Sequence, residues 1–93
     1  MDAAEALRIG LVQRVAEPDE LEAVTFALAE RIAANAPIGV QAAKAAARAS
    51  LSMGLEAGMQ YEEELITVCL GTEDRHEGIA AFMEKRAPAF KGR

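Results

Sequence analysis

Two residues near the carboxyl end of the chain have the type and the spacing to hold a ring and a phosphate. Phe82 and Lys85 are three positions apart, so on a helix the aromatic ring and the ammonium group emerge close together. The alternative is that Phe82 packs in a core, while Lys85 and Arg86 complement the negative end of the helix dipole. Spacing alone favours this alternative, in which Phe82 is a core residue and the two cations complement the dipole.

The other residues that could do chemistry lack partners. Glu62 to Glu64 form a run of carboxylates, but two carboxylates need a closed pocket to separate their pKa values, so we interpret the run as a solvated or salt-bridged face. Lys44 and Arg48, one helical turn apart, are interpreted as a solvated basic stripe. His76 has no Cys or Ser at a useful spacing, and no glycine-rich phosphate loop or zinc motif is present. We therefore predict no catalytic residue and no metal site.

Composition narrows the class of protein. A net charge of −5 argues against a nucleic-acid module, which needs a basic face. Cys69 is the only cysteine and no secretory leader pattern is present, which together predict a cytoplasmic protein. No apolar run approaches the roughly 20 residues that span a bilayer. Hydrophobic residues make up 52% of the chain but aromatics only 4%, which suits alanine-rich helices that bury further surface against a partner.

Helix caps, glycines and prolines at helix ends, and the spacing of apolar residues predict a mainly α-helical chain. Asp2 is the expected N-cap of a short first helix that ends at Ile9, with Gly10 in the left-handed conformation. Longer helices are expected at residues 19–35, 37–52 and 55–71, the second of them opening with Pro37.

The last helix is expected to begin at Asp74. Asp74 would accept the N–H of the third helical residue and Glu77 would reach back to the N-cap, as in a capping box. Pro88 cannot continue the helix, so residues 87–93 are expected to be extended, with Phe90 as an anchor.

Two segments indicate that the chain does not bury all of its own surface. Leu11 to Val15 reads as a short strand, yet no second strand is available to pair with it. Leu65 to Leu70 is apolar on almost every side of its helix and so must be buried on every side. Both features predict that the chain belongs to something larger or docks on another subunit.

Four segments, in this order and spacing, resemble the C-terminal portion of the crotonase superfamily, the enoyl-CoA hydratase/isomerase group. They are AAEALRIGLVQRV, APIGVQAAK, YEEE with TED, and EGIAAFMEKRAPAFKG. The resemblance implies a mainly α chain that forms the helical trimerisation region of the ClpP/crotonase-like fold, with one short N-terminal strand. Residues 1–16 would then dock on a spiral domain that this sequence lacks, and residues 17–93 would form the oligomerisation and coenzyme A-contacting region.

The resemblance also implies a function. Family members hydrate or isomerise enoyl-CoA thioesters through an enolate-like intermediate, but their oxyanion-hole donors and catalytic glutamates lie upstream, so no catalytic residue is carried over. Phe82 and Lys85 match the positions that approach the adenine and phosphate end of coenzyme A, which is part of the substrate; no other cofactor is expected. The implied partners are an acyl-CoA and further copies of the chain, as a trimer or a dimer of trimers. The alternative is a helical self-association module without enzymatic activity.

Overall fold

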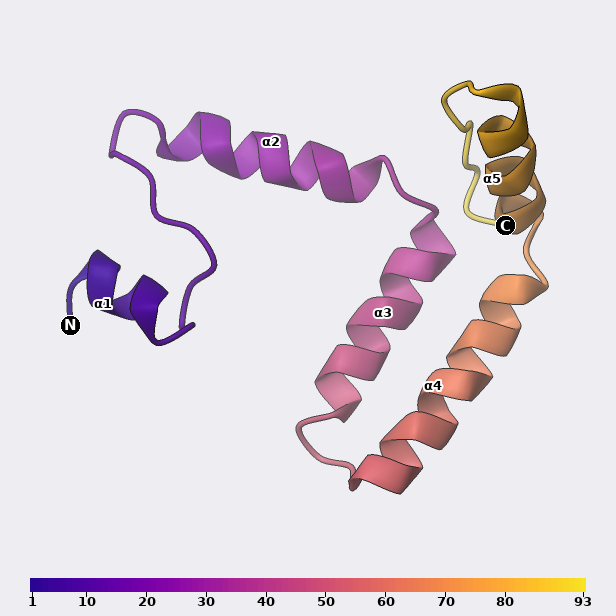
Figure 1. Ribbon diagram of the computed structural model, residues 1–93, viewed down its shortest axis with the longest axis horizontal. Helices are drawn as coiled ribbons and strands as arrows, with labels where there is room; N and C mark the ends of the chain where they lie inside the picture. The colour runs from indigo at the N-terminus through magenta and orange to yellow at the C-terminus, as the bar shows by residue number, and fades with distance from the viewer. The chain divides into compact units, whose positions relative to one another are not determined.

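The computed structural model describes residues 1–93, and all of its regular structure is helical (Figure 1). In chain order the helices are α1 (Ala3–Arg8), α2 (Leu21–Ala33), α3 (Pro37–Ala49), α4 (Leu55–Leu70) and α5 (Glu73–Glu84). The predicted mainly α class is therefore confirmed. The chain divides into two compact units, residues 1–31 and 32–93. None of the five helices has both the length and the hydropathy needed to cross a membrane.

The first helix forms as its sequence predicts. The Asp2 carboxylate accepts the N–H of Glu5 at 2.8 Å, which satisfies one of the free donors in the first turn of α1. Gly10 has a φ of 77°, the left-handed conformation that a glycine adopts at little cost after a helix. The predicted N-cap at Asp2 and the predicted left-handed glycine at Gly10 are both confirmed.

The strand predicted at Leu11 to Val15 is wrong for this chain, because the segment has no regular structure. A strand needs a neighbouring strand to pair its N–H and C=O groups, and the chain contains none. The end of α1 also uses two of the donors that a strand would need. The N–H groups of Leu11 and Val12 donate to the Ala6 carbonyl at 2.9 and 3.3 Å.

In the second unit α3 and α4 lie side by side and run in opposite directions (Figure 1). Pro37 occupies the first turn of α3, where its missing N–H costs nothing. The helix ends at Ala49, three residues before the predicted end, and the N–H groups of Ser50 to Met53 form turn hydrogen bonds instead. A short connection at Gly71 and Thr72 leads from α4 into α5.

Very little of the chain is fully buried. Ala81, at 1% exposure, is the one fully buried apolar residue, and Asp74, at 2%, is the one fully buried charged residue. Ile66, Val68 and Leu70 in the apolar half of α4 all remain at least half exposed. The prediction that residues 1–16 dock on a separate domain concerns parts outside this chain and stays a prediction.

Candidate functional site

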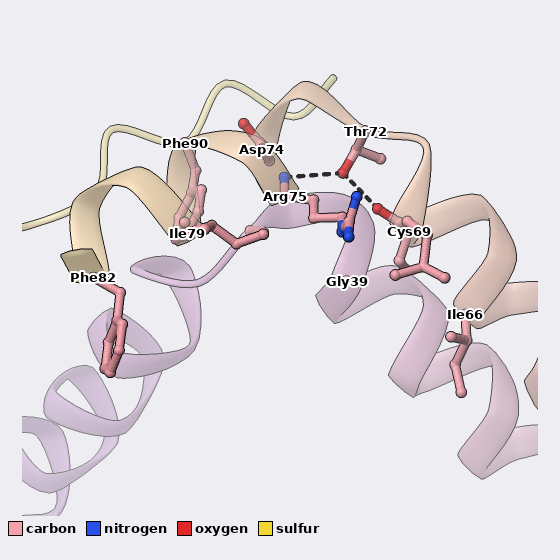
Figure 2. Close-up of a pocket in the computed structure, with 12 residues that line it drawn as sticks. Gly39, Ile66, Cys69, Thr72, Asp74, Arg75, Ile79, Phe82 and Phe90 are labelled. Atoms are coloured by element: carbon pink, nitrogen blue, oxygen red, sulfur yellow. Dashed lines mark hydrogen bonds between the residues drawn. The ribbon is translucent and has the colours of Figure 1, made fainter.

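Thr72, rather than Asp74, caps the helix that carries the predicted site. The Thr72 hydroxyl accepts the N–H of Arg75 at 3.2 Å and donates to the Cys69 carbonyl at 2.7 Å (Figure 2). One side chain thus satisfies a donor at the start of α5 and an acceptor at the end of α4. The predicted capping box of Asp74 and Glu77 is wrong, because both carboxylates bind a segment that is distant in sequence.

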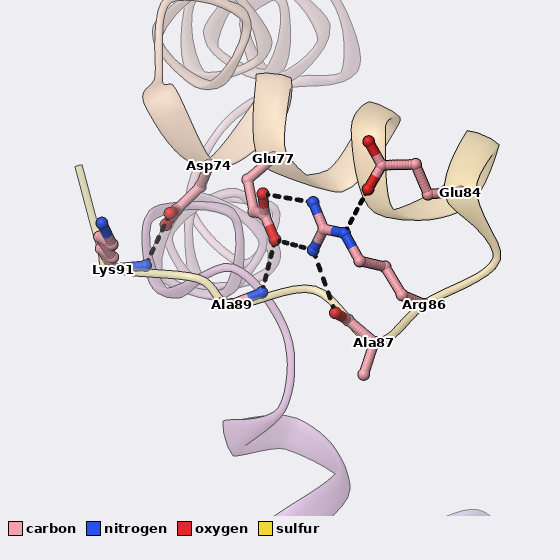
Figure 3. A network of polar contacts seen from close by, with 7 residues as sticks. All are labelled: Asp74, Glu77, Glu84, Arg86, Ala87, Ala89 and Lys91. Atoms are coloured by element: carbon pink, nitrogen blue, oxygen red, sulfur yellow. Dashed lines mark hydrogen bonds and ion pairs between the residues drawn. The ribbon is translucent and has the colours of Figure 1, made fainter.

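Asp74 holds the end of the chain. One carboxylate oxygen accepts the Lys91 N–H at 2.7 Å (Figure 3), and the other accepts the Gly92 N–H at 2.7 Å. The N–H of Asp74 itself donates to the Arg93 carbonyl at 3.0 Å. The buried carboxylate is therefore fully hydrogen-bonded, as a buried charge must be. The segment at 87–93 runs back along α5 as a result (Figure 1).

Glu77, one helical turn after Asp74, makes a second set of contacts to the same segment. Its Oε1 accepts the Ala89 N–H at 2.7 Å, and its two oxygens pair with the Arg86 guanidinium at 2.6 and 3.0 Å (Figure 3). The Arg86 contact, followed by the Ala89 N–H, lowers the pKa of Glu77 from 4.5 to about 2. Glu84 also pairs with Arg86, at 2.6 Å, and the two carboxylates raise the pKa of Arg86 further.

Helix α5 ends at a left-handed residue that is not glycine. Lys85 has a φ of 54°, its N–H donates to the Phe82 carbonyl at 3.2 Å, and the Arg86 N–H donates to the Ala81 carbonyl at 3.0 Å. These two bonds form the helix-ending arrangement in which glycine is the usual left-handed residue. A lysine here pays a backbone cost that glycine would avoid.

The two predicted site residues lie at this end of α5, but they do not share one pocket. Phe82 is 81% exposed, so it is not a core residue in this chain. Its ring borders a hollow of about 470 Å³, which we call the α5 pocket (Figure 2). Lys85 is exposed, lies outside the lining of this pocket and forms no ion pair. The apolar lining of the α5 pocket includes Ile66, Leu70, Ile79, Phe82 and Phe90.

The remaining candidates are placed as the sequence predicts. Glu62 to Glu64 are exposed on α4, and Lys44 and Arg48 are exposed on α3, so both sets are solvated faces. His76 is exposed, with Nδ1 3.1 Å from the Thr72 carbonyl oxygen. No group of His, Cys, Asp and Glu side chains has the arrangement of metal ligands.

The residues missed by sequence reasoning are those that bind the C-terminal segment. The sequence predicts that Asp74 and Glu77 are caps, because capping and binding of a distant segment both use a carboxylate near a helix start. A usable signal was the segment after Pro88, whose backbone N–H groups have no helix or strand to pair with and so need acceptors elsewhere. An acidic pair one turn apart on the preceding helix supplies those acceptors.

Comparison with known proteins places the chain in a family. All of its residues, 1–93, match the family described as Enoyl-CoA hydratase/isomerase. The chain is 45% identical to the 2,3-dehydroadipyl-CoA hydratase of Escherichia coli (strain K12) over 98% of its own length and 36% of that protein. It is 50% identical to the (E)-benzylidenesuccinyl-CoA hydratase of Thauera aromatica over 99% of its length and 36% of that protein.

A solved structure agrees with these sequence matches. The crystal structure of enoyl-CoA hydratase from Bacillus anthracis superimposes with a TM-score of 0.94 at 41% identity, covering 98% of this chain and 35% of that one. The chain thus spans about 36% of the length of the curated relatives that it matches. Fold and sequence agree over essentially every residue, and the chain belongs to the enoyl-CoA hydratase/isomerase family.

Proposed function

We propose that this chain supplies part of a coenzyme A site and an oligomerisation surface to an enzyme that hydrates or isomerises enoyl-CoA thioesters. The relatives named above are hydratases of two different CoA thioesters, so the acyl group varies while coenzyme A stays constant. In this proposal Phe82 contacts the adenine and Lys85 a phosphate of coenzyme A.

One observation carries the proposal: an exposed ring and an unpaired ammonium group lie three residues apart at the end of one helix. Of the other cations in this part of the chain, Arg86 is already paired with Glu77 and Glu84, and Arg93 is paired with Glu73. Lys85 has no such partner and is therefore free to meet a phosphate. An aromatic face and a cation are suited to a base and a phosphate, respectively.

The test uses the enzyme in which this chain is joined to the rest of the family fold. A charge-assisted contact to phosphate contributes about 1.5 to 3 kcal/mol, so Lys85→Gly should raise KM for an enoyl-CoA by roughly ten- to a hundredfold. The change should leave kcat nearly unaltered, because the contact is remote from the thioester and stabilises ground and transition states alike. Glycine is chosen because it also suits the left-handed backbone at this position.

Two comparisons sharpen this test. Lys44→Ala removes an exposed lysine from α3 and should change KM less than about twofold, as expected for a solvated charge. Dephospho-coenzyme A thioesters should bind the Lys85→Gly variant about as well as the phosphorylated substrate does. If the variant still prefers the phosphorylated form as strongly as the unmutated enzyme, Lys85 is only a helix-end charge.

The chain by itself is expected to show no hydration of crotonyl-CoA. Glu62 to Glu64 are exposed to water, whereas acid–base chemistry on a thioester needs carboxylates held in a pocket beside oxyanion donors. An assay at high protein concentration, in a preparation cleared of host hydratases, measures this. Turnover that disappears in Glu62→Gln or Glu64→Gln would contradict the proposal.

A second candidate function is self-association without catalysis. The half-exposed apolar residues of α4 favour it, because such a face is covered in a stable protein. The two candidates differ in their requirement for Lys85: the coenzyme A proposal depends on its charge, and self-association does not.

A further inference from the structure

We propose that Asp74 and Glu77 are positioning residues, which fix the C-terminal segment along α5 and thereby place the Phe90 ring as one wall of the α5 pocket. This inference does not rest on the proposed coenzyme A contact, because it concerns only the segment and the ring.

The backbone on both sides of Phe90 is held by a carboxylate. Glu77 accepts the N–H of Ala89, the residue before the ring, and Asp74 accepts the N–H of Lys91, the residue after it. Gly92 adds a second bond to Asp74, and its φ of 74° is a left-handed conformation that glycine adopts at little cost. A residue fixed on both sides has little freedom to move its side chain away.

The Phe90 ring lies beside Gly78 of α5. A Cβ placed on Gly78 would lie 3.5 Å from Phe90 Cε1, an ordinary van der Waals distance, so the ring is within side-chain reach of this face of α5. A Cβ on Gly92 would lie 3.6 Å from the Pro37 side chain, so the segment also passes close to the start of α3. The segment thus joins two walls of the α5 pocket, which α3 and α5 both line.

Two neighbouring ion pairs provide matched controls. Glu73 pairs with the Arg93 side chain at 2.8 Å, and Glu84 pairs with Arg86 at 2.6 Å. Neither carboxylate accepts a backbone N–H of the segment. Replacing Glu73 or Glu84 removes one negative charge from α5, as replacing Asp74 or Glu77 does, but leaves the hydrogen bonds to the backbone of the segment intact.

The experiment measures amide exchange and the ring signal in the full 93-residue chain labelled with 4-fluorophenylalanine. The chain has three phenylalanines, so the fluorine spectrum has three signals, and Phe90→Leu assigns the one of interest. Asp74→Ala should speed exchange of the Lys91 and Gly92 amides by about ten- to a hundredfold, the effect of a lost charge-assisted hydrogen bond. The Ala89 amide should also exchange faster, although Asp74 does not touch it, and the Phe90 signal should move toward that of the free amino acid.

Conservative changes separate positioning from general stability. Asp74→Asn keeps one acceptor oxygen and should give an intermediate effect at Lys91, Gly92 and the Phe90 signal. Glu73→Gln and Glu84→Gln should leave all of these within about twofold of the unmutated chain.

The proposal is overturned if Asp74→Ala affects only its own two partners, leaving Ala89 and the Phe90 signal unchanged. If Asp74→Ala lowers the helical circular dichroism, Glu77→Ala decides instead, because alanine favours the helix. Glu77 does not contact the Lys91 and Gly92 amides. Faster exchange of these amides in Glu77→Ala therefore supports positioning by both carboxylates, and unchanged exchange refutes the proposal.

Discussion

Lys85 combines a strained backbone with an unpaired charge. Glycine at this position would end α5 without the cost that a Cβ brings in the left-handed region. Residues held in unfavourable conformations concentrate at functional sites, and this observation leads to a functional hypothesis for Lys85. The Lys85→Gly enzyme described above removes the ammonium group without adding backbone strain.

Glu77 should make the stability of the second unit depend on pH. Its pKa falls from 4.5 to about 2 on folding, so between these values the unfolded chain binds a proton that the folded chain does not. The stability contributed by Glu77 is therefore complete above about pH 4.5 and is lost as the pH falls toward 2. We expect the Tm difference between the unmutated chain and Glu77→Gln to shrink across this range.

Thermal melts monitored by circular dichroism at a series of pH values measure that difference. Asp74 and Glu84 remain in both proteins, so the comparison isolates the Glu77 carboxylate. A Tm difference that stays constant as the pH falls would show that the ion pair with Arg86 does not contribute to folding.

At the scale of elements, Thr72 is the junction between α4 and α5. Its hydroxyl serves both helix ends, so Thr72→Ala should lower the free energy of unfolding by about 1 kcal/mol, within the range of about 0.5 to 2 found for N-caps. Thr72→Ser keeps the hydroxyl and should retain most of the stability. Urea unfolding followed by circular dichroism gives both values. If Thr72→Ala and Thr72→Ser lower the free energy of unfolding equally, the effect comes from the Thr72 methyl group and not from its hydroxyl.

At the scale of the whole molecule, the chain leaves much of its apolar surface uncovered. Ile66 and Val68 are 50% and 60% exposed, and only two residues of the chain are fully buried. Covering 400 Å² of such surface is worth on the order of 10 kcal/mol before the entropy of association, at about 25 cal/mol per Å². The apolar half of α4 is therefore the surface that we expect to drive assembly.

We predict that the chain self-associates at micromolar concentration, which sedimentation velocity measures. Val68→Glu should shift it toward the monomer, because a carboxylate in a covered apolar face has no partner. Gln60→Glu adds the same charge to an exposed position of the same helix and should change little. A compact monomer with a cooperative melt would show that the chain needs no partner for this face.

Local chemistry in the sequence determined most of the helices. The Asp2 cap, Gly10 and Pro37 act over three or four residues, so their outcome does not depend on the rest of the fold. Four dispersed segments also sufficed to indicate the family. The apolar stretch in α4 could be located directly from its continuous run of apolar residues.

Only the tertiary structure decided what the acidic residues of α5 do. Asp74 binds amides 17 and 18 residues away, and nothing local distinguishes such a carboxylate from a helix cap. The strand expected at Leu11 to Val15 likewise depended on a pairing partner that the chain does not supply. Hydrogen bonds between distant segments depend on how the chain folds back, because the same donor or acceptor can be satisfied locally or across the fold.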